Sequence, residues 1–185
     1  MFSIERPPVA KRHLKPGLQS LGALFAAVAL LLGLAGPAAA ESQTIPGTGV
    51  VPGTVGDLEK LFVSNGSTSV VAKAYGPDIE CGVSRWVSIV MRDGDGTRYT
   101  AMGGCYPGDP ASGGGWHKSL SRGNTLVNCS GFTLRYNSTG GFWRFEVPRS
   151  CLGRLANRIK VVTAELSSGS PNPGLAGPTR WLSRG

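Results

Sequence analysis

The stretch FTLRYNSTGGFWRFEV, residues 132–147, decides the fold class. On either side of a Ser-Thr-Gly-Gly loop, apolar residues recur at every second position, which is the pattern of a half-buried β-strand. A symmetric register pairs three sets of residues on one face: Phe132 with Val147, Leu134 with Phe145, and Tyr136 with Trp143. The stretch therefore predicts a β-hairpin that buries one side.

A second hairpin is predicted by Asn65-Gly66, which separates alternating runs at 58–64 and 67–75. Asn-Gly is the strongest short hairpin signal, because a two-residue type I′ turn needs φ > 0 at both positions. We therefore expect a tight turn at these two residues.

A third hairpin is predicted from strands at 84–92 and 97–102, joined by Asp-Gly-Asp-Gly at 93–96. Its first strand is apolar on both faces, with Val87, Ile89 and Met91 on one face and Trp86 and Val90 on the other. A strand buried on both faces is typical of the centre of a sheet.

Shorter elements are indicated towards the C-terminal end. Residues 149–155 predict a turn or one short helical turn. Residues 159–166 predict a strand, and the break in alternation at Val161-Val162 indicates a β-bulge. The Ser-, Gly- and Pro-rich residues 167–178 predict a loop, and residues 180–182 predict a short edge strand.

These elements predict an all-β protein, because no long stretch of period 3.6 follows residue 40. About seven or eight antiparallel strands favour a single β-sandwich of immunoglobulin-like or jelly-roll type, with a small β-barrel as the alternative. The sandwich domain is expected over residues 55–185, with a loop and tail from 167. Residues 41–54, rich in Gly, Pro and Thr, are expected to form an extended leader.

The N-terminal residues have the composition of a cleaved signal peptide. Basic residues precede the apolar stretch 21–35, and small residues follow at 36–40. The apolar stretch is shorter than the ~20 residues that span a bilayer, which favours cleavage over a membrane anchor. We therefore expect cleavage after Ala40 and a secreted, extracellular protein without a stable membrane anchor.

The charge of the chain is mildly basic, with a formal net charge of +8 and only 16% charged residues. No basic run follows residue 40, so an ordinary soluble surface is favoured over a polyanion-binding site. Nucleic-acid-binding motifs are also absent from the sequence, and no nucleic-acid partner is expected.

The four cysteines are expected to form two disulfides, because export implies an oxidising compartment. Extension of the 132–147 hairpin sets Cys129 opposite Ser150, beside Cys151. Extension of the 84–102 hairpin sets Cys105 opposite Ser84, near Cys81. Of the three possible pairings, the hairpin registers therefore favour Cys81–Cys105 and Cys129–Cys151.

The chain lacks the residue sets of common enzymes, so the sequence leans against catalysis. It contains no G-x-S-x-G motif, and His117 is the only histidine after residue 40. The converging carboxylates of a glycosidase would have to be Asp78 or Glu80 with Asp109. With no C-x-x-C motif either, we expect no cofactor and no metal.

One loop carries candidate binding residues. Trp116 follows three glycines and precedes His117, and Tyr106 lies in the same connection between strands. A large aromatic side chain on such a loop suits stacking on a sugar ring or on a partner's apolar surface. The alternative is that Trp116 folds back and caps the sandwich. The candidate binding residues are Trp116, His117 and Tyr106.

Two short motifs carry a family resemblance: Cys-x-Gly-Phe-x-Leu-x-Tyr at 129–136, and Val-Pro-Arg-Ser-Cys-Leu-Gly at 147–153, followed by an alternating strand. With Gly56-Asp57 before the first hairpin, they resemble a group of small exported actinobacterial proteins of uncharacterised function. The resemblance covers roughly residues 56–166. It implies a two-disulfide β-sandwich and an exported location, and it implies no catalytic residues.

The favoured function is an exported, non-catalytic binding module for extracellular or cell-wall carbohydrate. A protein-interaction or inhibitor module is the alternative, and a secreted hydrolase is a weaker one. The expected partners are therefore a cell-wall polymer, a glycan or another extracellular protein.

Overall fold

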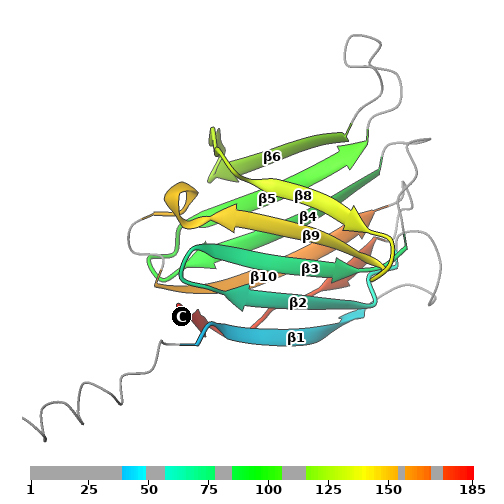
Figure 1. Cartoon of the computed structure of the whole chain (residues 1–185), viewed down its shortest axis with the longest axis horizontal. Helices are drawn as coiled ribbons and strands as arrows, with labels where there is room; N and C mark the ends of the chain where they lie inside the picture. Colours follow the sequence, from blue (N-terminus) through cyan, green and yellow to red (C-terminus); the bar gives the residue numbers. More distant parts are fainter. Residues whose placement is uncertain (1–38, 49–56, 78–84, 106–115, 154–156, 168–172) are drawn as a thin grey trace, which may run out of the picture. The chain divides into compact units, whose positions relative to one another are not determined.

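The computed structural model of the chain describes residues 39–48, 57–77, 85–105, 116–153, 157–167 and 173–185. Within these ranges the protein consists of twelve β-strands and one short 3-10 helix (Figure 1). Every strand pair is antiparallel. The prediction of an all-β, antiparallel protein is confirmed. Among the described residues, no helix is long and apolar enough to span a bilayer.

The strands form two halves of one sheet. The first half comprises β1 (Glu41–Thr48), β2 (Lys60–Asn65), β3 (Ser69–Tyr75), β9 (Phe142–Pro148) and β8 (Thr133–Asn137). The second half comprises β11 (Gly174–Ala176), β10 (Arg158–Ser167), β4 (Arg85–Asp93), β5 (Arg98–Cys105), β6 (Trp116–Arg122) and β7 (Thr125–Leu126), with β12 (Leu182–Ser183) paired to β10. The strand order is β7-β6-β5-β4-β10-β11-β1-β2-β3-β9-β8.

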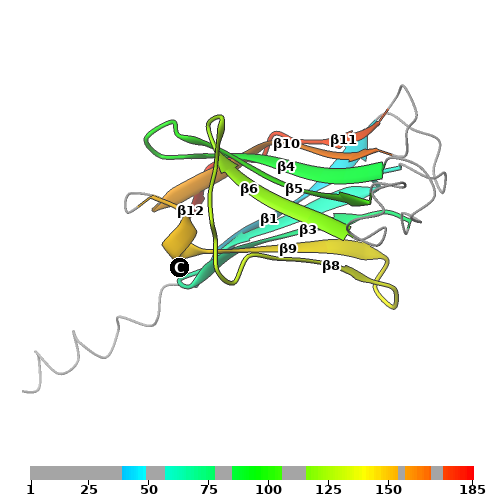
Figure 2. The same cartoon turned by 90° about the horizontal axis from the view of Figure 1, so that it is seen from above.

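The prediction of a sandwich with about seven or eight strands is wrong in its strand count and in its separation into two sheets. β1 pairs with β2 on one side and with β11 on the other, so the twelve described strands are continuous. The sheet curls at this junction into a half-barrel, and its two halves face each other (Figure 2). The physical reason is that a strand paired on both edges leaves no edge at which two sheets could separate.

β1 also corrects the predicted leader. Residues 41–54 were expected to be an extended leader, but Glu41–Thr48 forms a strand that pairs with β2 from Glu41 opposite Asn65 to Pro46 opposite Lys60. Only Ile45 of this strand packs against the core. β1 is therefore held by backbone hydrogen bonds more than by apolar burial. A strand held in this way needs few apolar residues, so its sequence shows no apolar alternation.

The hydrophobic core lies between the two halves. Its largest fully buried side chains come from both halves and from the segment before β2: Tyr99, Phe145, Leu58, Leu61, Ile89, Leu120, Leu166, Leu182, Val63, Val70 and Val87. At ~25 cal/mol per Å² of apolar surface removed from water, this shared core is the main force that holds the halves together.

The register predicted for the hairpin at 132–147 is confirmed. Leu134 lies opposite Phe145, and Tyr136 lies opposite Trp143. Trp143 and Phe145 are buried, and the Tyr136 and Trp143 rings lie 4.9 Å apart. The hairpin forms as predicted because only one register places the apolar residues of both strands on the core side.

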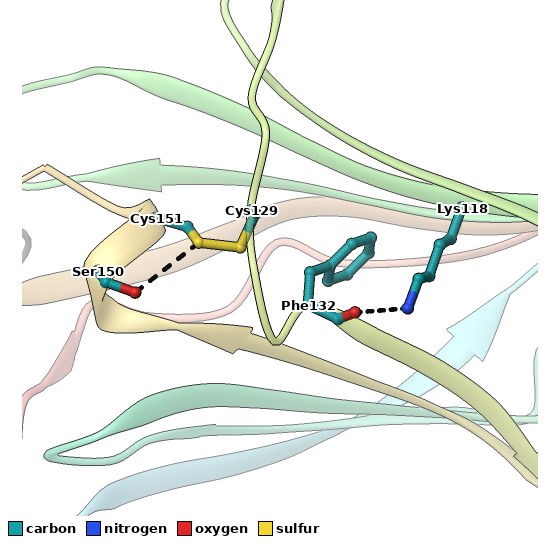
Figure 3. Close-up of a disulfide and its surroundings, with 5 residues drawn as sticks. All are labelled: Lys118, Cys129, Phe132, Ser150 and Cys151. Carbon is teal, nitrogen blue, oxygen red and sulfur yellow. Dashed lines mark hydrogen bonds between the residues drawn. A yellow bond between two sulfur atoms is a disulfide. The ribbon is translucent and has the colours of Figure 1, made fainter.

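The disulfide predicted at the open end of this hairpin is also confirmed. Cys129 is bonded to Cys151, with the Cα atoms 5.5 Å apart. Figure 3 shows the bond linking the segment before β8 to the helix η1 (Arg149–Cys151), which lies within residues 149–155, where a turn or one short helical turn was expected. Cys81 lies outside the described residues, so the Cys81–Cys105 bridge stays a prediction.

The hairpin at Asn65-Gly66 is present, but its predicted turn is wrong. No described non-glycine residue has a positive φ, and Gly66 is not among the glycines that do. Asn65 is fully buried and donates from Nδ2 to the carbonyl of Leu182 at 2.7 Å. Its Oδ1 accepts a hydrogen bond from Arg149. These tertiary contacts, absent from any local turn pattern, set the conformation of the turn.

The predicted register of the β4–β5 hairpin is wrong by one residue. Arg92 pairs with Arg98 and Arg85 pairs with Cys105, where Ser84 was expected opposite Cys105. The turn takes up one extra residue: the amide of Thr97 donates to Asp93 Oδ1 at 2.9 Å, and Gly96 adopts a φ of +83°. The central position of β4 is confirmed, since it lies between β5 and β10.

The C-terminal predictions are largely confirmed. β10 has a register shift between Val161 and Thr163, where a bulge was expected. A short strand was expected at 180–182; β12, which pairs with β10, is Leu182–Ser183 and overlaps it at one residue. The loop predicted at 167–178 is wrong in part, because Gly174–Ala176 forms β11 between β10 and β1. This strand was missed because its three residues are too few to show an alternation.

Candidate functional site

The three binding residues predicted from the sequence are not described as one site. Tyr106 lies outside the described residues. Trp116 begins β6 opposite Cys105, and its side chain is likewise outside the described part. His117 follows it, is exposed and lies opposite Gly104. The site formed by Trp116, His117 and Tyr106 therefore stays a prediction.

His117 borders a shallow hollow of about 270 Å³ between β5 and β6. Its lining comprises Met102, Gly103, Gly104, His117, Lys118 and Ser119. The ammonium group of Lys118 donates to the carbonyl of Phe132 at 2.7 Å, as Figure 3 shows. Lys118 thus bridges β6 to the segment that begins β8, and its hydrogen bond serves the fold.

The acidic candidates do not converge in the described part of the chain. Asp78, Glu80 and Asp109 all lie outside it. Asp93 is buried and structural, because Oδ1 accepts from the amides of Asp95 and Thr97 and Oδ2 accepts from the Tyr99 hydroxyl at 3.3 Å. Among the described residues, no cluster of three or more His, Cys, Asp or Glu side chains could hold a metal ion.

A different surface brings chemistry-bearing side chains together: the solvent side of the first half of the sheet. Along β2, β3 and β9 every second residue belongs to the core, including Leu61, Ala74 and Trp143. The residues between them must point to the opposite side. Three of these outward residues are aromatic, namely Phe62 on β2, Tyr75 on β3 and Phe142 on β9.

We call this surface the aromatic face, and define it by Phe62, Tyr75, Phe142, Lys60 and Lys73. The order β2-β3-β9 makes the five residues neighbours, because Lys60 pairs with Tyr75, Tyr75 with Phe142, and Phe62 with Lys73. All three aromatic side chains are partly buried. Their rings therefore remain partly open to solvent on a continuous, three-stranded surface.

The rings and the lysines are in direct contact. The Tyr75 and Phe142 ring centres are 5.2 Å apart at an interplanar angle of 53°. Lys60 Nζ lies 4.4 Å from the Tyr75 ring centre, and Lys73 Nζ lies 4.9 Å from that of Phe142 and 5.5 Å from that of Phe62. Each lysine is thus held over an aromatic ring by a cation–π interaction, worth about 0.5–1 kcal/mol at an exposed site.

Polar groups border the aromatic face. Arg144, opposite Lys73, forms an ion pair with Glu146 at 2.5 Å, and Ser69 donates to the same carboxylate at 3.2 Å. On the other side, β1 contributes Thr44 opposite Phe62 and Pro46 opposite Lys60, both exposed. Rings flanked by cations, hydroxyls and an ion pair can stack on an apolar surface of a ligand while hydrogen bonding to its polar groups.

Sequence reasoning did not single out this face. One signal was present: Phe142 lies on the polar side of the 132–147 alternation, where a solvent-facing aromatic residue is unexpected. Its neighbour Tyr75 is far away in the chain. The pairing of β3 with β9 that joins them is a long-range contact, which no local pattern reveals.

In comparisons with protein-family models, curated proteins and solved structures, nothing matches this chain.

Proposed function

We propose that the protein is an exported, non-catalytic binding module that holds an extracellular or cell-wall carbohydrate on the aromatic face. The observation that carries the proposal is the contact of Phe62, Tyr75 and Phe142 with two lysines on the solvent side of one sheet.

The chemistry of the face matches that of a sugar chain. A pyranose ring has a flat side of C–H groups that packs on aromatic rings, and a rim of hydroxyls that accept hydrogen bonds from ammonium groups. The aromatic residues extend over three adjacent strands, which is about 10 Å in the hydrogen-bonding direction. This length allows contact with more than one sugar ring of an extended chain.

A glycan suits this face better than a protein partner does. The core of a protein–protein interface is apolar and poor in charged residues. On the aromatic face, lysines lie directly over the rings, and none of its aromatic residues is among the large exposed hydrophobic side chains of the described chain, which are Leu126, Leu175 and Trp181.

Export is part of the proposal. The Cys129–Cys151 disulfide fits an oxidising compartment, and the N-terminal sequence has the composition of a signal peptide cleaved after Ala40. We also propose that the protein belongs to the group of small exported actinobacterial proteins, because it contains the two motifs at 129–136 and 147–153.

The test is cosedimentation of the mature protein with insoluble peptidoglycan sacculi, competed by soluble β-1,4-linked N-acetylglucosamine hexamers. The variant Tyr75→Leu/Phe142→Leu keeps apolar cover on the sheet and removes both rings. We expect its affinity for sacculi to fall about tenfold or more, equivalent to ~1.4 kcal/mol. Leu175→Ala, an exposed apolar residue on β11, is the matched control and should bind normally.

Trp116→Ala in the same assay separates the aromatic face from the site predicted from the sequence. Unchanged binding by Tyr75→Leu/Phe142→Leu together with loss of binding by Trp116→Ala would move the site to the β5–β6 end. Equal retention of all variants and wild type, without competition by the hexamer, would contradict carbohydrate binding altogether.

A further inference from the structure

A second unusual surface lies on the solvent side of the other half of the sheet. Lys160 on β10 pairs with Arg92 on β4, and Arg92 pairs with Arg98 on β5. Their chain neighbours Ile159, Met91 and Tyr99 are buried in the core. The three basic side chains therefore stand side by side on the outer face, in a row that crosses three strands.

Arg158 extends this row. It lies two residues before Lys160, on the same side of β10, and it is exposed. Its guanidinium carbon is 4.9 Å from the Trp181 ring centre, and Lys160 Nζ is 5.2 Å from the same centre. We call Arg92, Arg98, Arg158, Lys160 and Trp181 the basic patch.

The cations of the basic patch have no ion-pair partner among the described residues. The ion pairs Arg144–Glu146 and Arg180–Glu41 lie outside the patch. Asp93, beside Arg92 in the chain, is turned into the interior, where Tyr99 and the turn amides bind its carboxylate. Asp95, the next acidic residue along the chain after Asp93, is exposed in the turn between β4 and β5.

Such a row has a cost for the free protein. Like charges directly opposite each other on adjacent strands destabilise a sheet. The row occupies two successive cross-strand positions, Lys160–Arg92 and Arg92–Arg98. A ligand that carries negative charges would remove this repulsion when it binds.

The side chains of the basic patch are partly fixed before any ligand arrives. The Trp181 ring holds Arg158 and Lys160 near each other despite their like charge. The stem of Arg158 also runs along the turn, since a Cβ added at Gly94 would lie 3.1 Å from Arg158 Cγ. Ordering of these side chains on binding therefore costs less entropy than it would for free surface cations.

An open hollow of about 530 Å³ continues the patch past Arg158. Its lining includes Arg158, Arg184 and Ser183. The guanidinium of Arg184 donates to the carbonyl of Ser67 at 2.9 Å. This hydrogen bond fixes Arg184 at this end as a fifth cation. The row of Arg98, Arg92 and Lys160 is thus followed by Arg158 and by Arg184 at the hollow.

We infer that the basic patch is a binding site for a linear polyanion that carries phosphate groups along its chain. The arginine fork matches the oxygens of a phosphate and binds them through two parallel hydrogen bonds. A single small anion would not use a row that extends over three strands, about 10 Å. This site lies on the opposite half of the sheet from the aromatic face and takes a different ligand.

The chemistry of the patch favours such a polymer over a nucleic acid or a lipid surface. Single-stranded nucleic acid is bound by stacking successive bases on several aromatic side chains, whereas Trp181 is the single aromatic residue of the basic patch. Binding to a bilayer uses apolar side chains that insert beside the cations, and Trp181 is the one large exposed apolar residue of the patch.

From the sequence alone, an ordinary soluble surface was favoured over a polyanion-binding site, because no basic run follows residue 40. The structure shows how the charges come together without a run. Residues 92 and 98 come from one hairpin and residues 158 and 160 from a distant strand, and the pairing of β4 with β10 makes them neighbours.

The test measures binding of the mature protein to inorganic polyphosphate by isothermal titration calorimetry at several salt concentrations. We expect binding that weakens with salt, with a log–log slope of about −3 for roughly four neutralised phosphates. Arg92→Gln/Arg98→Gln should lower the affinity tenfold or more. Arg122→Gln/Arg135→Gln, which removes two exposed charges elsewhere, should change it less than threefold.

Arg92→Glu makes the test independent of folding defects. It sets a carboxylate between Lys160 and Arg98, so its urea midpoint should equal or exceed that of the wild type while polyphosphate binding is lost. Wild-type affinity of this variant would overturn the inference. So would tighter binding of the wild-type protein to single-stranded oligothymidine or to phosphatidylglycerol vesicles than to polyphosphate of equal charge.

Discussion

Lys60 Nζ lies 4.4 Å from the ring centre of Tyr75, its direct partner across the β2–β3 pair. The contact joins a flexible cation to an aromatic ring on the side of the sheet that faces solvent. It defines the edge of the aromatic face nearest to β1, where Pro46 lies opposite Lys60.

This contact should matter more for binding than for folding. Lys60→Met keeps the stem that covers the ring and removes the charge. We expect the free energy of unfolding, measured by urea denaturation, to fall by about 0.5–1 kcal/mol, the value of an exposed cation–π pair. A loss above about 2 kcal/mol would show that the lysine has a larger structural role than its contacts indicate.

Gly47→Ala tests whether β1 is an integral strand. The amide of Gly47 donates to the carbonyl of Glu59 at 2.8 Å, and a Cβ at Gly47 would overlap the carbonyl of Leu58. Because the obstacle is backbone, we expect a loss of at least about 1–3 kcal/mol in urea denaturation. Thr44→Ala, on the exposed side of the same strand, should change stability by less than about 0.5 kcal/mol. Equal stability of both variants would return residues 41–48 to the role of a leader.

The Cys129–Cys151 disulfide should contribute substantially to stability. The two residues are separated by 22 positions, and closure of a loop of this length stabilises by about 3 kcal/mol in the chain-entropy model. Cys129→Ser/Cys151→Ser should therefore lose about 2–4 kcal/mol in urea denaturation under oxidising conditions. Under reducing conditions the difference from the wild type should shrink, and a difference unaffected by reductant would assign the loss to packing instead.

Acid should loosen the contact between β1 and β12. A hydrogen bond from the backbone amide of Ser183 lowers the pKa of Glu41 below its ordinary value of 4.5, and Arg180 lowers it further. A carboxyl with a lowered pKa stabilises the fold above its ordinary value, and this contribution is lost as the pH falls through its folded value. Urea midpoints between pH 7 and pH 3 should therefore fall less steeply for Glu41→Gln than for the wild type. Parallel curves would remove Glu41 from the acid response.

Burial of Arg149 disfavours its charged form, whereas the contacts of Glu41 favour the charged form of that carboxyl group. Desolvation by burial and, to a smaller extent, the nearby charge of Arg184 together lower the pKa of Arg149 to about 10. The guanidinium nevertheless stays charged at neutral pH, where it donates from Nε to the carbonyl of Gly66 at 3.1 Å and from Nη2 to Asn65. Arg149 thereby links the β2–β3 turn to η1, the helix that carries Cys151.

What the sequence predicted well was local and amphipathic. The Leu134–Phe145 and Tyr136–Trp143 pairs followed from a single alternation, because only one register places the apolar residues of both strands on the core side. The same register placed Cys129 beside Cys151. Where a turn residue was recruited into distant contacts, as Asn65 was by Leu182 and Arg149, the local rule failed.

The two proposed sites were beyond sequence reasoning for one shared reason. Tyr75 meets Phe142, and Arg92 meets Lys160, only through pairings between strands that are distant in the chain. β1 was missed for another reason, since a polar strand that pairs on both edges needs no apolar alternation. Non-local pairing therefore determines the functional surfaces, whereas local pattern determines the hairpins from which they are built.

The most direct measurement of the central claim is the mapping of backbone amide shifts by NMR as the β-1,4-linked N-acetylglucosamine hexamer is added to the mature protein. Saturable shifts at residues 60–64, 71–75 and 142–146, on the strands of the aromatic face, are the predicted result. Shifts confined to β5 and β6 around His117, or no saturable shift at millimolar hexamer, would contradict it.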